Sequence, residues 1–432
     1  MLAGLALVAV PQTASSPQTA SSTRPAPDAN AKPSTGTGSP TPAETLAALR
    51  SYAAHLAAAE GSLRLGDSSA ARRWLDDAPA LWRGWEHRRL LAAADTDEPS
   101  EALDGRALPL DGPSRAVAWD PRGGRLAVAA GDEIAVWSLR AGIILARHVC
   151  AEARDVAWHP DGRRLAAACI DSVALVDLAS PTAPPTPWSP LPARAVAWSP
   201  DGERLAAGTD DGSLLLGSAQ ASGTLRLQRH DGAVEAVAWS PDGRLLVTGS
   251  ADGMLRLWLP AVGSPNGQHR ADGPLAAVSW RSGRALPAPT RLLVAGGVAG
   301  LEARPEGGER LRLDRRAVRA LDWSADGRRL AVAVGPGDHD TDSDGSIVLW
   351  AVVDPPAVES PEAASRTEAT SVDAPTEPAE PAEADDPTPA FFELTRLPVD
   401  AVDLAFDPWG RMLAVASRSG PPTVLGETPG LQ

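Results

Sequence analysis

Beyond residue 110 the chain alternates apolar and polar residues in short runs that turn signals interrupt. Residues 194–198 (RAVAW) alternate with a period of two, and a Pro-Asp-Gly turn follows within two residues. A small, aliphatic run over residues 204–208 comes next, and then the Asp-Gly pair Asp211-Gly212 and a further apolar run. A period of two predicts β-strands, and both Pro-Asp-Gly and Asp-Gly predict tight turns. The pattern therefore predicts three short antiparallel strands joined by turns.

This block recurs along the chain at a nearly constant interval. Its anchoring aromatic residues are spaced 39 to 43 residues apart, at Trp119, Trp158, Trp198, Trp239, Trp280 and Trp323. A last copy, VDLAFDPWGRMLAVAS, places Phe406 at the same position, and less regular stretches such as 224–228 and 310–313 supply a fourth strand. Four antiparallel strands per 40 or so residues indicate one blade of a propeller. The copy after Trp280 lacks Pro-Asp-Gly and is the weakest of the seven.

The two ends of the array predict how the ring closes. The last copy ends with a third strand near residues 423–426 and has no fourth strand after it. Residues 105–110 (GRALPL) precede the first copy and read as a spare fourth strand. Because an unpaired sheet edge is unfavourable in a circular array, we predict that residues 105–110 complete the seventh blade.

In residues 42–94 the apolar positions recur with the period of an α-helix instead of a strand. Leucines and alanines recur at intervals of three and four residues. Gly66 is expected to end the first helix, and Asp67 to cap the N-terminus of the second. Pro79 ends that second helix. We expect three tryptophans to anchor this helical unit on a neighbouring surface, with ligand stacking as the alternative: Trp74, Trp82 and Trp85.

The repeat resembles the WD40 repeat over residues 110–428, about three-quarters of the chain. The resemblance implies an all-β, seven-bladed WD40 β-propeller over residues 103–428, preceded by the helical unit over residues 42–94. It also implies a blade-stabilising tetrad of His, Ser or Thr, Asp and Trp, which is complete in one copy: His230, Thr248 (or Ser250), Asp252 and Trp258. Elsewhere the tetrad is eroded, and Gly217 stands in a Trp position.

The helical unit resembles the segment that precedes WD40 propellers in many planctomycete-type bacterial proteins. Some of those proteins carry a serine/threonine kinase domain ahead of it. The matching residues are Gly66-Asp67, Pro79 and the run Arg83-Gly84-Trp85-Glu86. No Gly-rich phosphate loop, HRD or DFG sequence occurs here, so kinase activity is not inferred.

Charge is unevenly distributed along the 432 residues. The net charge of -15 argues against nucleic-acid binding. Residues 354–393 hold 11 acidic residues against the single Arg366, with many prolines and few large aliphatic residues. Such a composition cannot bury enough apolar surface to fold, so we expect a disordered acidic, Pro-rich insertion over residues 354–390. It is interpreted as a solvated spacer, or alternatively as a segment for a basic partner.

Residues 1–41 form the N-terminal part. Residues 2–10 (LAGLALVAV) are too few to span a bilayer but fit the apolar region of a signal peptide, although no positive start or clear cleavage site accompanies them. Export or anchoring is slightly favoured over a cytoplasmic start or a mis-assigned first Met, and membrane contact is expected through this segment alone. Residues 11–41 read as a disordered linker. The two cysteines, Cys150 and Cys169, leave the redox compartment open.

Catalytic and metal motifs are missing from the sequence. The seven histidines are scattered, and no HExxH, GxSxG or clustered Cys/His motif occurs. The Asp-rich run over residues 338–344 resembles the start of a calcium loop, but Ala351 stands where the bidentate Glu is required. We therefore expect no catalytic residue, no cofactor and no metal, and interpret the run as a solvated loop, with a weak calcium site as the alternative.

One position of the repeat could carry binding. The residue four before the anchoring aromatic is an arginine in four copies: Arg115, Arg154, Arg194 and Arg319. In a propeller this position lies where the innermost strand begins, at one mouth of the central channel. Guanidinium groups bind carboxylates, so we expect this rim to take an acidic peptide segment, with solvated arginines as the alternative.

Together these features favour a non-enzymatic, monomeric scaffold that binds protein partners through its loop faces. The alternative is a sensor or regulatory module that acts with a separate serine/threonine kinase or binds a small ligand in the channel.

Overall fold

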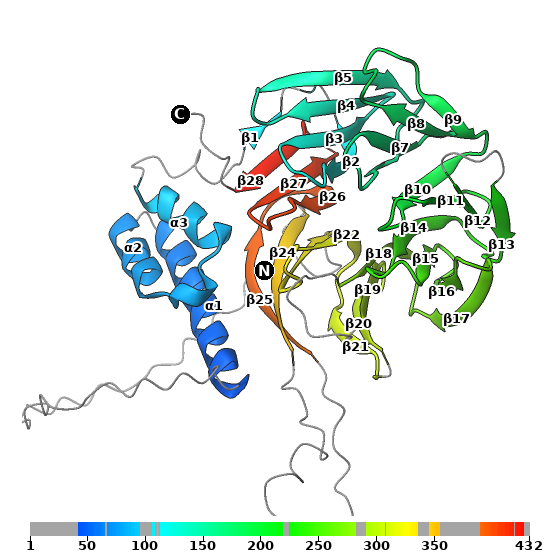
Figure 1. Cartoon of the computed structure of the whole chain (residues 1–432). Helices are drawn as coiled ribbons and strands as arrows, with labels where there is room; N and C mark the ends of the chain where they lie inside the picture. Colours follow the sequence, from blue (N-terminus) through cyan, green and yellow to red (C-terminus); the bar gives the residue numbers. More distant parts are fainter. Residues whose placement is uncertain are drawn as a thin grey trace, which may run out of the picture. The chain divides into compact units, whose positions relative to one another are not determined.

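Seven four-stranded antiparallel sheets follow one another around a ring in the computed structural model (Figure 1). The structure describes residues 42–64, 67–95, 106–108, 110, 113–218, 224–281, 291–306, 308–335, 345–354, 389–418 and 420–426. All of these residues belong to one compact unit, Thr41–Gln432. The expected N-terminal arm, the Asp-rich run over residues 338–344 and nearly all of the acidic insertion lie outside the described residues.

The seven sheets are the blades, numbered here from the first to the seventh. Blade one contains β2 (Ser114–Trp119), β3 (Arg125–Ala130), β4 (Glu133–Ser138) and β5 (Ile143–Val149), and blade two contains β6 (Asp155–Trp158), β7 (Arg164–Ala168), β8 (Val173–Asp177) and β9 (Thr186–Ser189). Blade three contains β10 (Ala193–Trp198), β11 (Arg204–Thr209), β12 (Ser213–Ser218) and β13 (Leu225–Gln228), and blade four contains β14 (Val234–Trp239), β15 (Leu246–Ser250), β16 (Met254–Leu259) and β17 (Ser264–Arg270). Blade five contains β18 (Leu275–Trp280), β19 (Leu292–Gly297), β20 (Gly300–Pro305) and β21 (Leu311–Asp314). Blade six contains β22 (Val318–Trp323), β23 (Arg329–Val334), β24 (Ser346–Val353) and β25 (Ala390–Leu397). Blade seven contains β26 (Ala401–Phe406), β27 (Met412–Ser417) and β28 (Thr423–Gly426), completed by β1 (Arg106–Ala107).

The prediction that the residues before the first copy seal the ring is confirmed. β1 pairs with β28 antiparallel, with Arg106 opposite Val424, and the Leu108 amide donates to the Pro422 carbonyl at 2.8 Å. Leu108 and Leu110 are buried in a core that includes residues of blades one and seven. The last blade is thus built from both ends of the array. Blade five is also complete, although its sequence has lost Pro-Asp-Gly.

The anchoring tryptophans pack each blade against the one before it, and three of the six also donate an indole hydrogen bond across that contact. The Trp158 indole N–H donates to the Ala118 carbonyl at 2.9 Å, and Trp239 makes the same bond to Ala197 at 3.0 Å. Trp119 bonds to the Ala405 carbonyl at 2.9 Å across the point of closure. A large ring suits this position because it fills the gap between blades. The indole nitrogens of Trp198, Trp280 and Trp323 are buried without a hydrogen-bond partner, so packing is what the six positions share. The constant spacing of these tryptophans follows from this geometry.

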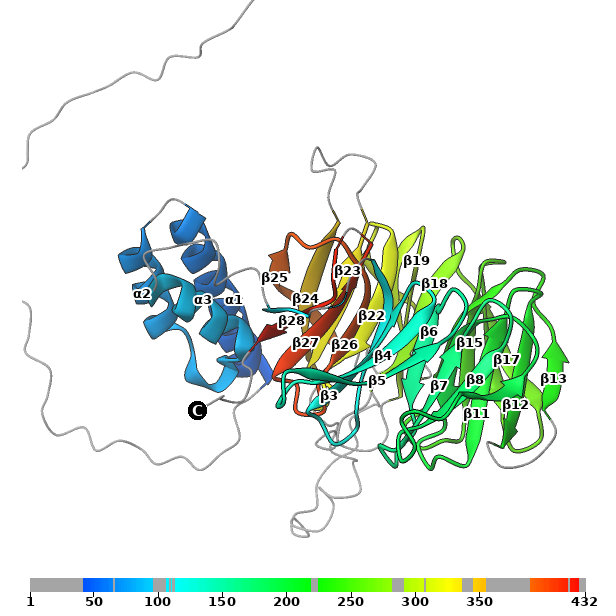
Figure 2. The same cartoon turned by 90° about the horizontal axis from the view of Figure 1, so that it is seen from above.

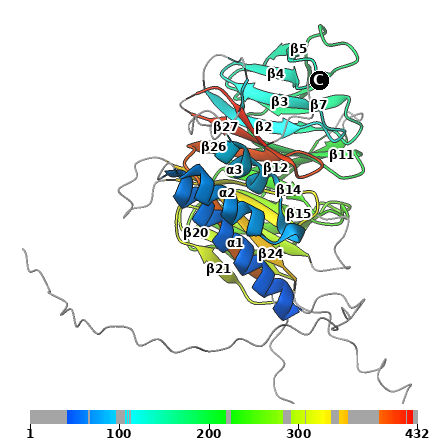
Figure 3. The ribbon, with the colours of Figure 1, turned by 90° about the vertical axis from the view of Figure 1, so that its left-hand side faces the viewer.

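The helical unit contains α1 (Pro42–Arg64), α2 (Ser68–Asp77), the 3-10 turn η1 (Ala80–Trp82) and α3 (Trp85–Asp95). As predicted, Asp67 caps α2, accepting from the Ala70 amide at 2.8 Å. Buried side chains of α1 share one hydrophobic core with β24 and β25 of blade six and with blade seven. Figures 2 and 3 show the helices beside these blades. No described helix is long and apolar enough to cross a membrane.

Arg329 of β23 fixes the helical unit to blade six. Its guanidinium donates to the Trp82 carbonyl at 3.2 Å and pairs with the buried carboxylate of Glu86 at 3.2 Å. Glu86 also accepts from the Tyr52 hydroxyl at 3.0 Å. A side chain at Gly84 would meet the Arg329 guanidinium at 2.3 Å, so glycine permits this close approach. The Arg-Gly-Trp-Glu run in the sequence therefore marks a docking contact.

The three tryptophans of the helical unit do not share one role. Trp82 packs against the core that the helices share with the blades, as predicted. Trp74 is 44% exposed and contacts the ring of His55 within the helical unit, so the expectation that it anchors the helices was wrong. The reason is that Ala71 and Leu75 supply the buried face of α2. The side chain of Trp85 lies outside the described residues.

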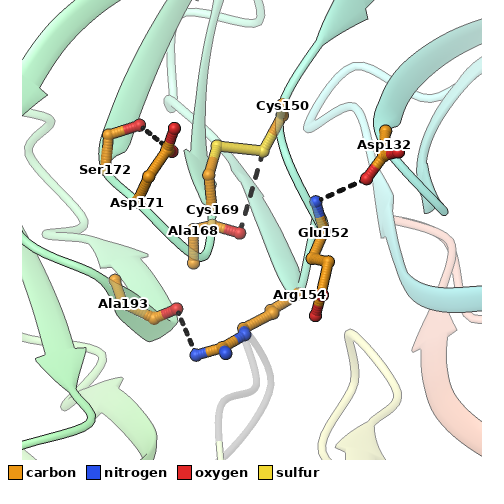
Figure 4. The surroundings of a disulfide bond; sticks show 9 residues. All are labelled: Asp132, Cys150, Glu152, Arg154, Ala168, Cys169, Asp171, Ser172 and Ala193. Carbon is orange, nitrogen blue, oxygen red and sulfur yellow. Dashed lines mark hydrogen bonds between the residues drawn. A yellow bond between two sulfur atoms is a disulfide. The ribbon is translucent and has the colours of Figure 1, made fainter.

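A disulfide joins blades one and two, between Cys150 after β5 and Cys169 after β7 (Figure 4). The two Cα atoms are 5.5 Å apart, and both side chains are buried. Because the bond closes a loop with a sequence separation of 19, it restricts the unfolded chain.

We expect reduction, or replacement of both cysteines by serine, to lower the free energy of unfolding by about 2–4 kcal/mol. Chemical denaturation with and without reductant measures this change, and titration of thiols in the unfolded, unreduced protein gives the fraction bonded. A reductant that lowers the stability of the double-serine variant as much as that of the parent chain would contradict the assignment.

Candidate binding face at the mouth of the channel

Three of the four predicted rim arginines line one cavity of about 670 Å³. Arg115 on β2 and Arg194 on β10 stand at the starts of inner strands, and Arg154 directly precedes the inner strand β6. Glu235 and Val402, at the equivalent positions of blades four and seven, line the same cavity, together with Pro113, Ser114 and Arg418. Because all inner strands begin at the same end of the ring, one repeat position gathers around one opening.

Arg319 and Arg418 depart from the sequence prediction. Arg319 is not among the residues that line the cavity, and its guanidinium pairs with Asp400 in the connection to blade seven. Arg418 follows β27, is exposed and lines the cavity. Sequence reasoning missed it because it examined the starts of inner strands, whereas Arg418 comes from the end of a second strand. The second strand runs back toward the same end of the blade, and that direction is the signal that could have revealed Arg418.

Carboxylates accompany the rim arginines. Arg154 pairs with Asp210 at 2.9 Å, and Arg194 pairs with both Asp210 and Glu235, the latter at 3.1 Å. Burial opposes ionisation of Asp210, but hydrogen bonds from the two arginines hold the pKa of its carboxyl below the usual value. Arg115 is half exposed and lies 3.6 Å from Glu152.

These ion pairs limit how freely the rim arginines can bind a ligand. Asp210 lies in the turn between the second and third strands of blade three, outside the repeat position that suggested a uniformly positive rim. An incoming carboxylate would have to share or replace the contacts of Arg154 and Arg194. Arg115 and Arg418, the most exposed of the set, are the first guanidinium groups that a ligand would reach.

Three partly buried aspartates on inner strands form a second set that the sequence prediction missed. Asp155 accepts from the Val196 amide at 2.8 Å, Asp322 from the Phe406 amide at 2.7 Å, and Asp403 from the Val117 amide at 2.8 Å. Each bond reaches the inner strand of the following blade. An Asp inside an otherwise apolar inner strand is the sequence signal for such a contact.

Burial shifts the titration of these three carboxyls. It raises the pKa of Asp155 to about 7, with a further contribution from the charge of Asp403, and that of Asp322 to about 7. It raises the pKa of Asp403 to about 6. The amide donors favour the ionised form but do not compensate for the loss of water.

The four tetrad residues of blade four are joined by hydrogen bonds. His230 Nε2 lies 2.7 Å from Thr248 Oγ1, and its Nδ1 lies 3.0 Å from Asp252 Oδ2. The Trp258 indole N–H donates to Thr248 Oγ1 at 3.0 Å. Thr248, rather than the alternative Ser250, thus occupies the tetrad position. In blade three, Gly217 faces Leu205 as Trp258 faces Leu246, so the site of the eroded tryptophan is also located.

The remaining titratable side chains of the described residues do not cluster into a metal site. Among these residues, no group of three or more His, Cys, Asp or Glu side chains could hold a metal ion. His159, one of the scattered histidines, is buried against the ring of Trp198 and lies 2.9 Å from the Gly202 carbonyl, so it connects blades two and three.

Comparison with known proteins gives a partial sequence match and an extensive structural one. The family profile "WD domain, G-beta repeat" matches residues 143–176, 191–216 and 222–258. No curated protein matches the sequence. A chain in a solved structure titled "Crystal Structure of Mitotic Checkpoint Complex" is similar, with a TM-score of 0.55 and 18% identity over 75% of this chain and 93% of that chain. At this identity the similarity shows the fold alone.

Proposed function

From the premise that this chain carries WD40 repeats and folds as a seven-bladed propeller, we propose that it is a non-enzymatic scaffold that binds an acidic peptide segment of a partner protein at the arginine-lined mouth. WD40 propellers are generally protein-interaction scaffolds. The observation that carries the finer proposal is the gathering of Arg115, Arg154, Arg194 and Arg418 around one cavity of about 670 Å³. Guanidinium groups bind carboxylates through paired hydrogen bonds, and a cavity open to solvent admits an extended peptide.

The charges of the rim define how such a peptide would bind. Glu235, Asp210 and Glu152 stand beside the arginines, so a peptide with isolated carboxylates would meet both attraction and repulsion. We expect a segment with several carboxylates to pair first with Arg115 and Arg418, the exposed arginines of the rim. The interaction is electrostatic at a partly exposed surface, so salt should weaken it.

The test uses a fluorescent oligoglutamate peptide and the full chain with Arg115 and Arg418 replaced by glutamine. We expect the parent chain to bind the probe and the double variant to bind it at least tenfold more weakly. Replacement of Arg163, which is exposed and pairs with Asp177 away from the mouth, is the matched control and should leave binding unchanged. Equal affinity in the double variant, or equal loss in the control, would exclude the mouth as the binding site.

A further inference from the structure

The outer strands of the blades differ in how their free edges are protected. An outermost strand presents unpaired N–H and C=O groups, and natural proteins shield such edges with proline, short strands, charges or covering elements. Proline occurs in β9 (Pro187) and in β17 (Pro265), and β17 is polar along its whole exposed length. β13 and β21 have four residues each and β1 has two. Helix α1 packs against β25.

β5 of blade one has no proline, is longer than the short outer strands, and is covered by no described element. It has seven residues without Pro or Gly, and among the described residues it pairs with β4 alone. Its side chains alternate, and the outward set is Ile143, Leu145, Arg147 and Val149. The three aliphatic members are 55%, 43% and 80% exposed, which is unusual for side chains with high strand propensity.

Two features of β5 could still discourage pairing. Arg147 is a charged residue on the edge, but its guanidinium is paired with the Glu133 carboxylate of β4. The ladder to β4 skips Leu145, which makes a β-bulge. The outer strands β17 and β25 have the same irregularity in addition to their other protections, so the bulge does not set β5 apart.

We infer that β5 is a self-association edge, which pairs antiparallel with β5 of a second copy of this chain. A two-fold axis at Ala146 places Ile143 opposite Val149 and Leu145 opposite Arg147. In this register all four outward residues of one copy meet residues of the other, and the two Arg147 side chains do not face each other. An isologous contact of this kind closes after two copies, so the product is a dimer and not a fibre.

This inference departs from the monomer that the sequence alone led us to expect, and it does not depend on the proposed peptide site, which lies at the channel mouth. The partner is a second copy because β5 is complementary to itself. Its apolar side chains can pack against those of the other β5, and its free backbone groups can pair with the same groups of the other strand.

Sedimentation velocity of the full chain over a hundredfold range of concentration tests the inference. We expect the mass of two chains at the upper end, and the mass of one chain throughout for the variant with Leu145→Lys and Val149→Lys. The control, Leu225→Lys with Val262→Lys, changes two exposed apolar residues on blades three and four and should remain dimeric. Circular dichroism shows that each variant is folded.

Hydrogen exchange locates the contact. Amides of β5 should exchange more slowly at high than at low concentration in the parent chain, and equally fast at both concentrations in the lysine variant. A parent chain that keeps the mass of one chain at every concentration would overturn the inference. So would a dimer that survives the lysine substitutions, because its interface would lie elsewhere.

Discussion

Replacing Leu108 and Leu110 with alanine should lower the free energy of unfolding by about 2–5 kcal/mol for each leucine, because both side chains are buried where the ring closes. They hold β1 against β28, the only strand with which it pairs among the described residues. Loss of this contact would expose the edge of blade seven and loosen its packing against blade one. The effect should therefore exceed that of an average core substitution.

Chemical denaturation of the full chain measures this prediction. Leu225→Ala is the matched control, since Leu225 is 48% exposed on the outer strand of blade three and its truncation should cost less than about 0.5 kcal/mol. Hydrogen exchange adds a local readout, because amides of β28 should lose protection before those of β15 in the double variant. Unchanged stability would mean that the seventh blade stands without its N-terminal strand.

The aspartates of the inner strands should lower the stability of the chain as pH rises from about 4 to about 7, because burial raises the pKa values of Asp155 and Asp322 to about 7 and of Asp403 to about 6. In this window the folded chain holds protons that the unfolded chain, with carboxyl pKa values near 4, has released. Each such carboxyl contributes a slope of about -1.4 kcal/mol per pH unit until it ionises in the folded state. Above pH 7 the slope should vanish.

Carboxyls with lowered pKa values affect the stability in a lower range of pH. Ion pairs and hydrogen bonds lower the pKa of Asp242 and Asp252 to about 2, so their stabilising contribution is lost only as pH falls below about 4. Histidines act in the opposite sense within the window, because burial lowers the pKa values of His148, His230 and His269 and the unfolded chain protonates them first. The contribution of the inner-strand aspartates is therefore read from the difference in slope between the parent chain and an aspartate variant.

Urea titrations at several pH values measure the slope. Asp322→Asn should flatten it, since the amide oxygen can still accept from Phe406 but the side chain no longer ionises. The slope is the readout because any cost of the asparagine amide group itself is the same at every pH. Asp171→Asn, at an exposed turn, should leave the slope unchanged. An identical slope in the Asp322 variant would show that this carboxyl does not control the pH dependence.

The sequence predicted the number of blades and the closure because both depend on local patterns. Spacing of the anchoring tryptophans reflects one buried ring between each pair of neighbouring blades, and that packing persists where the Pro-Asp-Gly turn is lost, as after Trp280. The fourth strands near residues 224–228 and 310–313 were placed to within one residue. Closure followed from counting strands at the two ends of the array.

Contacts between blades were harder to predict. Asp210 lies outside the aligned position of the rim arginines, so nothing in the repeat indicated that it would pair with Arg154 of the preceding blade. Cys150 and Cys169 meet because the end of the second strand of blade two lies beside the end of blade one, and their number alone left the pairing open. The role of Trp74 was misjudged because helical spacing alone did not show which face of α2 would be buried.

Closure of the ring by β1 sets an order of events during synthesis. The ribosome releases Leu108 and Leu110 before any blade exists, whereas their partner β28 is made after six blades have left the exit tunnel. Docking of the helical unit is delayed in the same way, because its partners β24 and β25 are also translated late. Domains generally fold as units during translation, and apolar surface that waits for a distant partner is prone to aggregate. A nascent chain stalled before residue 423 should therefore depend on chaperones.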